Sequence, residues 1–374
     1  MLITRLEAHD FRLFGELALD AHPRFNLVVG DNGAGKTSLL ETLHVLGRGA
    51  SWRVQQPQPL ARDGQQAWQV RGRLDEGGGA PPELLRVTWQ ERETRIELGA
   101  SVLGLSQLVR RVPLQILDPG MHRMLEEGPG IRRRFLDWGV FHVEHSFMPV
   151  WRRARRALNQ RNAVLRENGS AQLLAPWTRE LAEAAEQLSA LRRAHALEVQ
   201  RRSQELLLRL LPGERWQLRY ARGWDADRPY LEVLESGLER DRRHGMTMSG
   251  PQRAELGFYT AHAGDDGHKA VKGRISRGQQ KLLVAAFVLA QCWIVAERGG
   301  RAPVLLLDDF AAELSAAFQS RLLALLLDYP GQKFVTALEC SGVLKILADA
   351  HMFHVEHGVL RPPNADKIAN QKKH

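Results

Sequence analysis

A glycine-rich segment with one lysine is the first part of the chain that could do chemistry. Residues 30–37 read GDNGAGKT, directly after the apolar run 25–29 and before apolar residues at helical spacing. Glycines between a strand and a helix let backbone N–H groups face phosphate oxygens, and the helix amino terminus adds partial positive charge. A lysine ammonium and a threonine hydroxyl at the end of such a loop suit phosphate and Mg²⁺. The residues expected to contact the phosphates of ATP are Gly30, Asp31, Asn32, Gly33, Ala34, Gly35, Lys36, Thr37 and Ser38.

The scarcity of lysine in the chain also draws attention to position 36. Only nine of the 52 basic residues are lysine, and Lys36 is the sole lysine among the first 268 residues. A compact ammonium and a planar guanidinium bind phosphate differently. The composition therefore indicates a chemical requirement for lysine at position 36. The alternatives are a lysine retained by chance and a glycine turn that only joins a strand to a helix.

An apolar run that ends in two acids predicts the other half of such a site. Residues 304–307 read VLLL, and Asp308 and Asp309 follow them. We expect Asp308 to hold Mg²⁺ together with Thr37, because hard oxygen ligands suit this ion. Asp309 is placed to orient or polarise the attacking water, so Lys36, Asp308 and Asp309 are the candidate catalytic residues. The alternative is that the two acids cap the following helix.

A second segment also has the character of an anion site. Residues 276–280 read SRGQQ and open the apolar helix expected over 281–297. A serine, a glycine and a helix amino terminus suit an anion, although the first site already has its own loop. Two phosphate-facing surfaces in one subunit imply a nucleotide held between two subunits. The alternative is an ordinary serine N-cap.

Composition limits the class of protein. A chain of 374 residues can form two or three structural units. Hydrophobic residues at 44% and charged residues at 25% are ordinary globular values and exclude a disordered or collagen-like chain. Two cysteines without CxxC spacing favour a reducing compartment. The longest apolar run, 282–295, is too short to span a membrane, so we expect a cytoplasmic protein with no membrane partner.

The net charge of +9 favours an extended anionic partner, and nucleic acid is the leading candidate. Arginine contacts to phosphate would need no recognition of bases. Each arginine cluster alone is more typical of a solvated helix face, but together with the net charge they favour DNA. The clusters are Arg132-Arg133-Arg134, Arg152-Arg153, Arg155-Arg156, Arg192-Arg193 and Arg201-Arg202, near Trp138, Trp151 and Trp177.

The elements that must position these residues follow an α/β order. Short strands are expected over 1–29, and an antiparallel sheet across 52–105. A helical hairpin follows, with one arm that ends at Asn168-Gly169 and a second over 177–211. Strands and helices then resume, which makes the ATPase core discontinuous. We expect an ATPase head from 1–112 and 245–360, a helical lobe over 113–244 and a flexible tail over 361–374.

A pentapeptide occurs twice, at 141–145 and 353–357, and reads FHVEH both times. Its two histidines and its acid could suggest a metal site, but further ligands at a recognisable spacing are missing. Alternation of apolar and polar residues favours a strand at both positions.

Five segments together resemble one family. They are GDNGAGKT, SRGQQK, LLLDDF, the block LDPGMHRMLEEGPGIRRRFLDWGVFHVE at 117–144 and RRALNQRN at 155–162. They look like the RecF family of bacterial recombination mediators, which belongs with the ABC-type ATPase heads of SMC proteins. The likeness extends to about residue 357. It implies an α/β fold: an ABC-type P-loop ATPase head with an antiparallel β subdomain and a helical lobe inserted between the two halves of the core.

The resemblance also implies a function. Members would form an ATP-dependent homodimer on single-stranded or double-stranded DNA at gaps and single-strand to double-strand junctions. Weak, DNA-stimulated ATP hydrolysis would serve as a dimerisation switch. With RecR and RecO, the dimer would help to load RecA for gap repair and replication-fork maintenance.

By the same resemblance, four residues outside the loop would contact the nucleotide. Ser276, Gly278 and Gln279 would act on the ATP held by the partner subunit, and Arg12 would approach the phosphates. Two positions depart from the family pattern, because Ser315 replaces an aspartate and Gln252 replaces a histidine.

Two other functions stay open at this point. One is the ATPase subunit of a membrane transporter, which would not be expected to carry an arginine-rich helical insert. The other is a DNA-binding module with a structural ATP that is never hydrolysed. Salt-sensitive DNA binding and phosphate release would separate these functions from the first.

Overall fold

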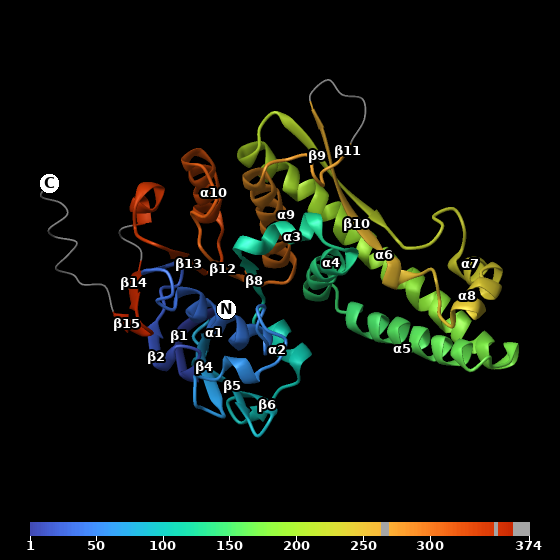
Figure 1. Cartoon of the computed structure of the whole chain (residues 1–374), viewed down its shortest axis with the longest axis horizontal. Coiled ribbons are helices and arrows are strands. Elements are labelled where there is room, and N and C mark those ends of the chain that lie inside the picture. The colour runs from blue at the N-terminus through green and yellow to red at the C-terminus, as the bar shows by residue number, and fades with distance from the viewer. Residues whose placement is uncertain (263–268, 348–350, 362–374) are drawn as a thin grey trace, which may run out of the picture. The chain divides into compact units, whose positions relative to one another are not determined.

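The structure is a computed structural model that describes residues 1–262, 269–347 and 351–361 (Figure 1). The chain forms two compact units. The first combines the residues up to Met121 with those from Gly300 onward, and the second is 122–299. The second unit is therefore inserted between the two sequence halves of the first, as a discontinuous core requires. The boundaries lie at 121/122 and 299/300, whereas the expected ones are at 112/113 and 244/245.

The first unit contains a six-stranded antiparallel sheet in the order β2-β1-β4-β5-β6-β7. Apolar residues alternate with polar ones along its longer strands, so one face joins the core. This confirms the antiparallel sheet expected from the alternating segments. The strands are β1 (Leu2–Phe11), β2 (Phe14–Asp20), β4 (Trp68–Asp75), β5 (Glu83–Gln90), β6 (Glu93–Leu98) and β7 (Ser101–Val102).

The other sheet of this unit is parallel except for its edge strand β15, in the order β15-β14-β3-β13-β12-β8. Strands β3, β13 and β12 are buried along their whole length, which explains why most of their residues are apolar. Their carboxyl ends meet at one edge. The strands are β3 (Phe25–Val29), β8 (Leu114–Leu117), β12 (Val304–Leu307), β13 (Lys333–Ala337), β14 (His351–Glu356) and β15 (Val359–Arg361).

Helix α1 fills the core between the two sheets. Its residues Leu39, Leu43 and Leu46 are fully buried in one cluster with strand residues such as Val70 and Leu306. The unit's helices and 3-10 turns are α1 (Lys36–Arg48), α2 (Leu105–Arg111), α10 (Ala316–Asp328), η1 (Gln58–Leu60) and η4 (Gly342–Leu347), and η2 (Pro119–His122) ends where the second unit begins.

The second unit is mainly helical and includes the expected helical hairpin, α5 and α6 (Figure 1). Helix α6 begins at Ala171 and not at 177, because the Ser170 side chain caps it by accepting from Leu173 N at 3.4 Å. The elements are α3 (Arg123–Glu126), α4 (Pro129–Val143), α5 (Phe147–Arg166), α6 (Ala171–Leu210), α7 (Tyr230–Ser236), α8 (Leu238–His244), α9 (Arg277–Arg298), β9 (Glu214–Ala221), β10 (Glu255–His262), β11 (Lys269–Ala270) and η3 (Pro251–Arg253).

Helix α9 explains why residues 245–299 belong to the second unit and not to the first. It packs on α6 and α4, and Gln291 joins the three helices by a 3.1 Å contact with His195 and a 3.1 Å bond to Phe135 O. By length and composition alone α9 is long and apolar enough to cross a membrane, but the core helices of soluble proteins meet the same criteria. Since 83% of its most apolar window is buried inside the structure, α9 is a core helix.

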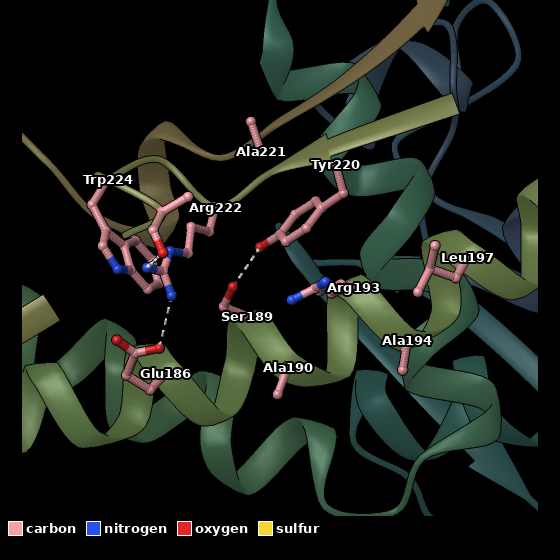
Figure 2. Close-up of a pocket in the computed structure, with 11 residues that line it drawn as sticks. Glu186, Ser189, Ala190, Arg193, Ala194, Leu197, Tyr220, Ala221, Arg222 and Trp224 are labelled. Carbon is pink, nitrogen blue, oxygen red and sulfur yellow. Dashed lines mark hydrogen bonds and ion pairs between the residues drawn. The ribbon is translucent and has the colours of Figure 1, made fainter. Parts of the chain in front are cut away.

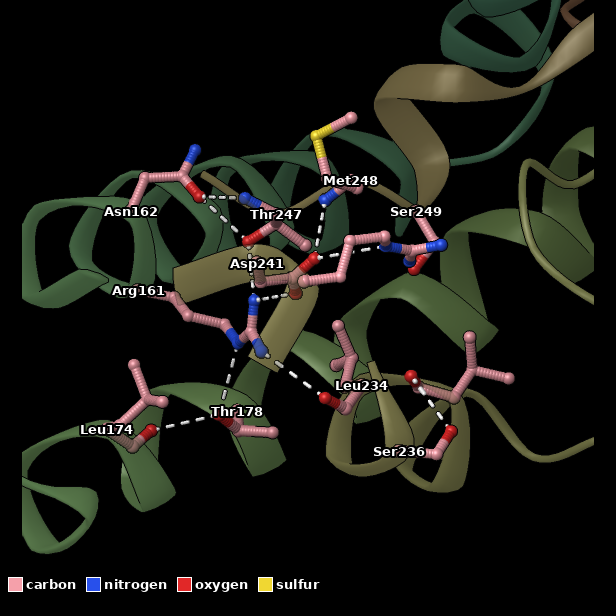
Figure 3. A network of polar contacts seen from close by, with 12 residues as sticks. Arg161, Asn162, Leu174, Thr178, Leu234, Ser236, Asp241, Thr247, Met248 and Ser249 are labelled. Carbon is pink, nitrogen blue, oxygen red and sulfur yellow. Dashed lines mark hydrogen bonds and ion pairs between the residues drawn. The ribbon is translucent and has the colours of Figure 1, made fainter. Parts of the chain in front are cut away.

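A buried ion pair ties the hairpin to α8 (Figure 3). Arg161 Nη1 donates to Asp241 at 2.7 Å and to the Thr247 hydroxyl at 2.7 Å. Arg161 Nε donates to Thr178 Oγ1 at 3.2 Å, so the guanidinium contacts groups from α6 and from the segment after α8. Both charged side chains are almost completely buried, at 0% and 1% exposure. The network fixes how α5, α6 and α8 pack.

The two FHVEH segments fold differently. The second lies mostly in strand β14, as expected. The strand prediction is wrong for the first copy, because Phe141, His142 and Val143 form the last turn of α4. The first copy continues the helix that begins at Pro129, and Phe141 extends its buried face. Of the expected tail over 361–374, Arg361 ends β15, and 362–374 lie outside the described residues.

Candidate nucleotide site

The glycine loop runs from the end of β3 to the first residue of α1 and has the shape needed to face phosphate. Gly35 is the N-cap of α1 at φ +121°, a conformation that side chains rarely allow. A side chain on Gly30 would collide with Val355 O of strand β14. The loop thus depends on glycine at both ends.

Lys36 folds back across this loop. Its Nζ donates to Gly30 O at 2.6 Å and to Asp31 O at 2.9 Å. No acidic residue occupies the first turn of α1, so the helix amino terminus and the ammonium both contribute positive potential here. The structure therefore places the single early lysine inside the predicted phosphate loop.

Asp308 and Thr37 meet although 271 residues separate them. Thr37 Oγ1 lies 3.0 Å from both carboxylate oxygens of Asp308, and Thr336 Oγ1 donates to Asp308 Oδ1 at 2.8 Å. Burial raises the pKa of Asp308, and the hydrogen bonds from Thr336 and Thr37 oppose that rise. The contact follows from the sheet order, since β13 lies directly between β3 and β12. A hydroxyl and a carboxylate at this spacing fit Mg²⁺, which prefers hard oxygen ligands.

Asp309 occupies a strained position beside Asp308. Its φ is +52°, in the left-handed region that few residues other than glycine adopt. Its N–H donates to Thr336 Oγ1 at 2.8 Å, and the residue is exposed. Thr336 therefore holds both acids in place. Sequence reasoning did not single out Thr336, and the only signal for it was a hydroxyl near the end of a buried strand.

Arg12 lies at the turn between β1 and β2 and binds α1. Its Nε and Nη2 donate to the two oxygens of Glu41 at 2.8 and 2.9 Å, and its Nη1 donates to Pro59 O at 2.7 Å. Glu41 is fully buried and also contacts Ser51 and Arg53. The Arg12 guanidinium thus contacts Glu41 and Pro59. Its approach to the phosphates stays a prediction.

Ser276, Gly278 and Gln279 lie in the second unit, at the amino terminus of α9. Ser276 is the N-cap, and its backbone N–H donates to Gln279 Oε1 at 2.9 Å while its hydroxyl accepts from Gln279 N at 3.3 Å. This is the capping box that an ordinary N-cap would also form. Ser276 is exposed, whereas Gly278 and Gln279 are half-buried, and the contact of these residues with a partner's ATP stays a prediction.

The two departures from the family pattern have local roles. Ser315 is the N-cap of α10, and its side chain accepts from Phe318 N at 3.3 Å. The Gln252 amide donates to Ser249 O at 2.9 Å and to Thr247 O at 3.2 Å, which closes its own loop. Both side chains therefore stabilise the elements that contain them.

Many arginines of the five clusters are used inside the second unit. Bidentate pairs join Arg132 to Glu255, Arg153 to Glu180 and Arg192 to Asp137, while Arg133 binds Ala254 O and Arg202 pairs with Glu297. Other members make no ion pair with any residue that the structure describes. They are the exposed residues Arg134, Arg152, Arg155, Arg156, Arg193 and Arg201.

A pocket of about 760 Å³ lies elsewhere, between α6 on one side and the end of β9 with the segment that follows it on the other (Figure 2). The Tyr220 hydroxyl bonds Ser189 Oγ at 3.4 Å, and Arg222 pairs with Glu186 at 3.4 Å across it. Arg193 reaches it from α6. Sequence reasoning predicted no site here, and the pocket contains none of the predicted nucleotide ligands.

Comparison with known proteins gives the family. Residues 2–361 match the family model described as RecF/RecN/SMC N terminal domain. The chain is 40% identical over 367 residues to the DNA replication and repair protein RecF of Chromohalobacter salexigens, covering 96% of this chain and 99% of that protein. The protein of the same name from Stenotrophomonas maltophilia is 41% identical over 96% of this chain and 98% of its own length.

Solved structures show the same fold. A structure described as the recombination mediator protein RecF with ATP, in the RecFOR pathway, matches with a TM-score of 0.81 at 21% identity and covers 97% of this chain and 98% of that one. An SMC head bound to a domain of ScpA matches with a TM-score of 0.64 at 16% identity, over 99% and 100% of the two chains. The fold is that of an ABC-type ATPase head, and the chain belongs to the RecF family.

Proposed function

We propose that the chain is an ATP-dependent, DNA-binding recombination mediator. It dimerises when ATP binds, closes on DNA at gaps and single-strand to double-strand junctions, and reopens after slow hydrolysis. With RecR and RecO it helps RecA to load in the cytoplasm. The observation that carries the proposal is the contact of Thr37 with Asp308 next to the loop that contains Lys36, in a chain about 40% identical to RecF proteins.

The residues divide the work of the site. The N–H groups of the glycine loop and the Lys36 ammonium bind the phosphates, while Thr37 and Asp308 would hold Mg²⁺. The ion, when bound, offsets negative charge on the phosphates. Asp309 orients the attacking water. Ser276, Gly278 and Gln279 contact the ATP of the partner subunit, so ATP stabilises only the closed dimer by mass action.

The test is ATP binding and phosphate release by Lys36→Met and by the unchanged chain. Loss of a charged hydrogen-bond donor costs up to about 3 kcal/mol, so we expect ATP to bind about a hundredfold more weakly. Lys36→Arg is the matched control, and it should also bind poorly because a guanidinium fork does not fit a site built for an ammonium. Wild-type ATP affinity in Lys36→Met would contradict the proposal.

Phosphate release, measured with and without gapped DNA, separates two roles of ATP. We expect slow release that DNA accelerates. ATP binding without any release would instead assign a structural role to the nucleotide.

A further inference from the structure

Most of the positive charge on helix α5 forms no ion pair with the described residues. The helix contains six arginines and no acidic residue. Arg153 pairs with Glu180 and Arg161 with Asp241. The other four make no ion pair with any of the described residues, and all four are exposed: Arg152, Arg155, Arg156 and Arg166. We call them the α5 arginine face.

The four arginines lie on one side of the helix. At about 100° per residue they fall within roughly 100° of arc, with Asn159 and Ala163 between them. The opposite side of α5 is buried and packs on α6, through residues such as Ala154 and Ala157. From Arg152 to Arg166 the face is about 21 Å long. The packing of α5 on α6 therefore fixes the side of the hairpin on which the α5 arginine face lies (Figure 1).

Two tryptophans position the guanidinium groups. The Arg155 guanidinium lies 5.0 Å from the Trp151 ring centre, and that of Arg156 lies 6.0 Å from the Trp177 ring centre. Stacking reduces the conformational freedom that these side chains lose on binding. Both rings are half-buried and already face arginines, so they offer no open platform for stacking of single-stranded bases.

We propose that the α5 arginine face binds the sugar-phosphate backbone of duplex DNA. The proposal rests on the function proposed above, that the chain binds DNA. A row of exposed cations on a helix that has no acidic residue of its own complements a polyanion, and duplex DNA presents one charge per about 1.7 Å of axis. At about 3.4 Å per base pair, the face spans roughly six base pairs. Contacts of this kind fix position and do not depend on sequence.

The test compares two double variants with the same change in charge. Arg152→Gln with Arg156→Gln removes two members of the face, and Arg193→Gln with Arg201→Gln removes two exposed arginines of α6. Anisotropy of a labelled duplex of about 30 base pairs, at about 50 to 200 mM salt, gives log Kd against log salt. Each lost phosphate contact lowers the magnitude of the slope by about 0.9, so we expect a fall of about 1.8 in the first variant only.

Further measurements distinguish a loss of charge from a loss of folding, and binding of duplex DNA from binding of single-stranded DNA. Arg152→Lys with Arg156→Lys keeps the charge and should keep the slope. ATP binding and ATP-dependent dimerisation should be unchanged in all variants. A slope that falls only with single-stranded oligothymidine overturns the assignment to duplex DNA.

A wild-type slope in the Arg152→Gln and Arg156→Gln variant also overturns the assignment, and leaves the face to an acidic protein segment or to solvent. In that case the proposed function stands, because the unchanged chain still binds DNA. If the unchanged chain itself does not bind DNA, the proposed function and this inference both fail.

Discussion

Asp308 is the residue on which the two halves of the nucleotide site depend. It accepts hydrogen bonds from Thr37, in the first turn of α1, and from Thr336, on the neighbouring strand. Thr336 also binds the backbone of Asp309. Asp308 and Thr336 therefore link the phosphate loop to Asp309, the acid that is proposed to orient the attacking water.

Replacement of Asp308 should separate binding from hydrolysis. Asp308→Asn keeps the size of the side chain and its oxygen acceptor, but removes the negative charge that would hold Mg²⁺. We expect ATP affinity to stay within about tenfold, whereas phosphate release falls about a hundredfold or more, as for loss of a charged catalytic contact. Thr336→Ser keeps the hydroxyl and should release phosphate at nearly the wild-type rate. Equal loss of binding and release in Asp308→Asn would refute this division.

Lys333 makes the stability of the first unit depend on pH. Its Nζ donates to Leu326 O at 3.0 Å and to Tyr329 O at the end of α10, and burial lowers its pKa from 10.5 to about 8. Between these two values Lys333 holds its proton in the unfolded chain and has lost it in the folded chain. The free energy of unfolding should therefore rise with pH from about 8 to about 10.5.

The measurement is the denaturant midpoint of the wild type and of Lys333→Met across this range. The advantage of the wild type over the variant should grow as pH rises, because the cost of burying the ammonium disappears. The exposed Lys345 is the control, and Lys345→Met should run parallel to the wild type. A constant difference between the wild type and Lys333→Met would show that Lys333 titrates as an ordinary lysine.

At the scale of elements, α5, α6 and α8 are held together by the buried pair of Arg161 and Asp241. Arg161→Met removes the 2.7 Å ion-pair partner of Asp241 and leaves this buried carboxylate only the Met248 N–H at 3.0 Å and Arg240 at 3.9 Å, which costs about 3–5 kcal/mol. Arg161→Met with Asp241→Leu should recover most of this loss. Arg153→Met on the same helix breaks a half-exposed pair and should cost at most about 1 kcal/mol. Chemical denaturation measures all three, and similar losses for Arg153→Met and Arg161→Met would contradict the argument.

Local patterns predict the elements of the first unit well. The alternation of β4 and β5, the apolar run of β12 and the glycines before α1 each specify their own structure. Local patterns fail where distant partners decide. The segment FHVEH ends a helix in one place and lies in a strand in the other, because its neighbours differ.

Distant partners also decide which arginines are available. Arg132 is neutralised by Glu255, which is 123 residues away, and Arg192 by Asp137, which is 55 residues away. A basic cluster in the sequence cannot show this pairing. The predicted domain boundary is misplaced for the same reason. The apolar run of α9 does not reveal that this helix packs on α6, so residues 245–299 are expected in the head.

At the scale of the whole molecule, the proposed switch requires two copies of the chain. Thr37 and Asp308 lie in the first unit, whereas the exposed N-cap Ser276 lies in the second. Ser276→Arg places a large cation where the partner's ATP is proposed to bind. We expect the variant to bind ATP as a monomer with wild-type affinity and to lose ATP-dependent dimerisation, measured by light scattering with and without ATP.

Ser276→Arg also removes a helix cap, which by itself costs about 1 kcal/mol. Ser170→Arg is the matched control, because Ser170 is likewise an exposed N-cap, at the start of α6. If lost capping were the cause, both variants would fail to dimerise. If Ser276 contacts the partner's nucleotide, only Ser276→Arg fails. ATP-dependent dimers of Ser276→Arg at wild-type strength would mean that one chain binds the nucleotide alone, and a switch based on shared ATP would then be wrong.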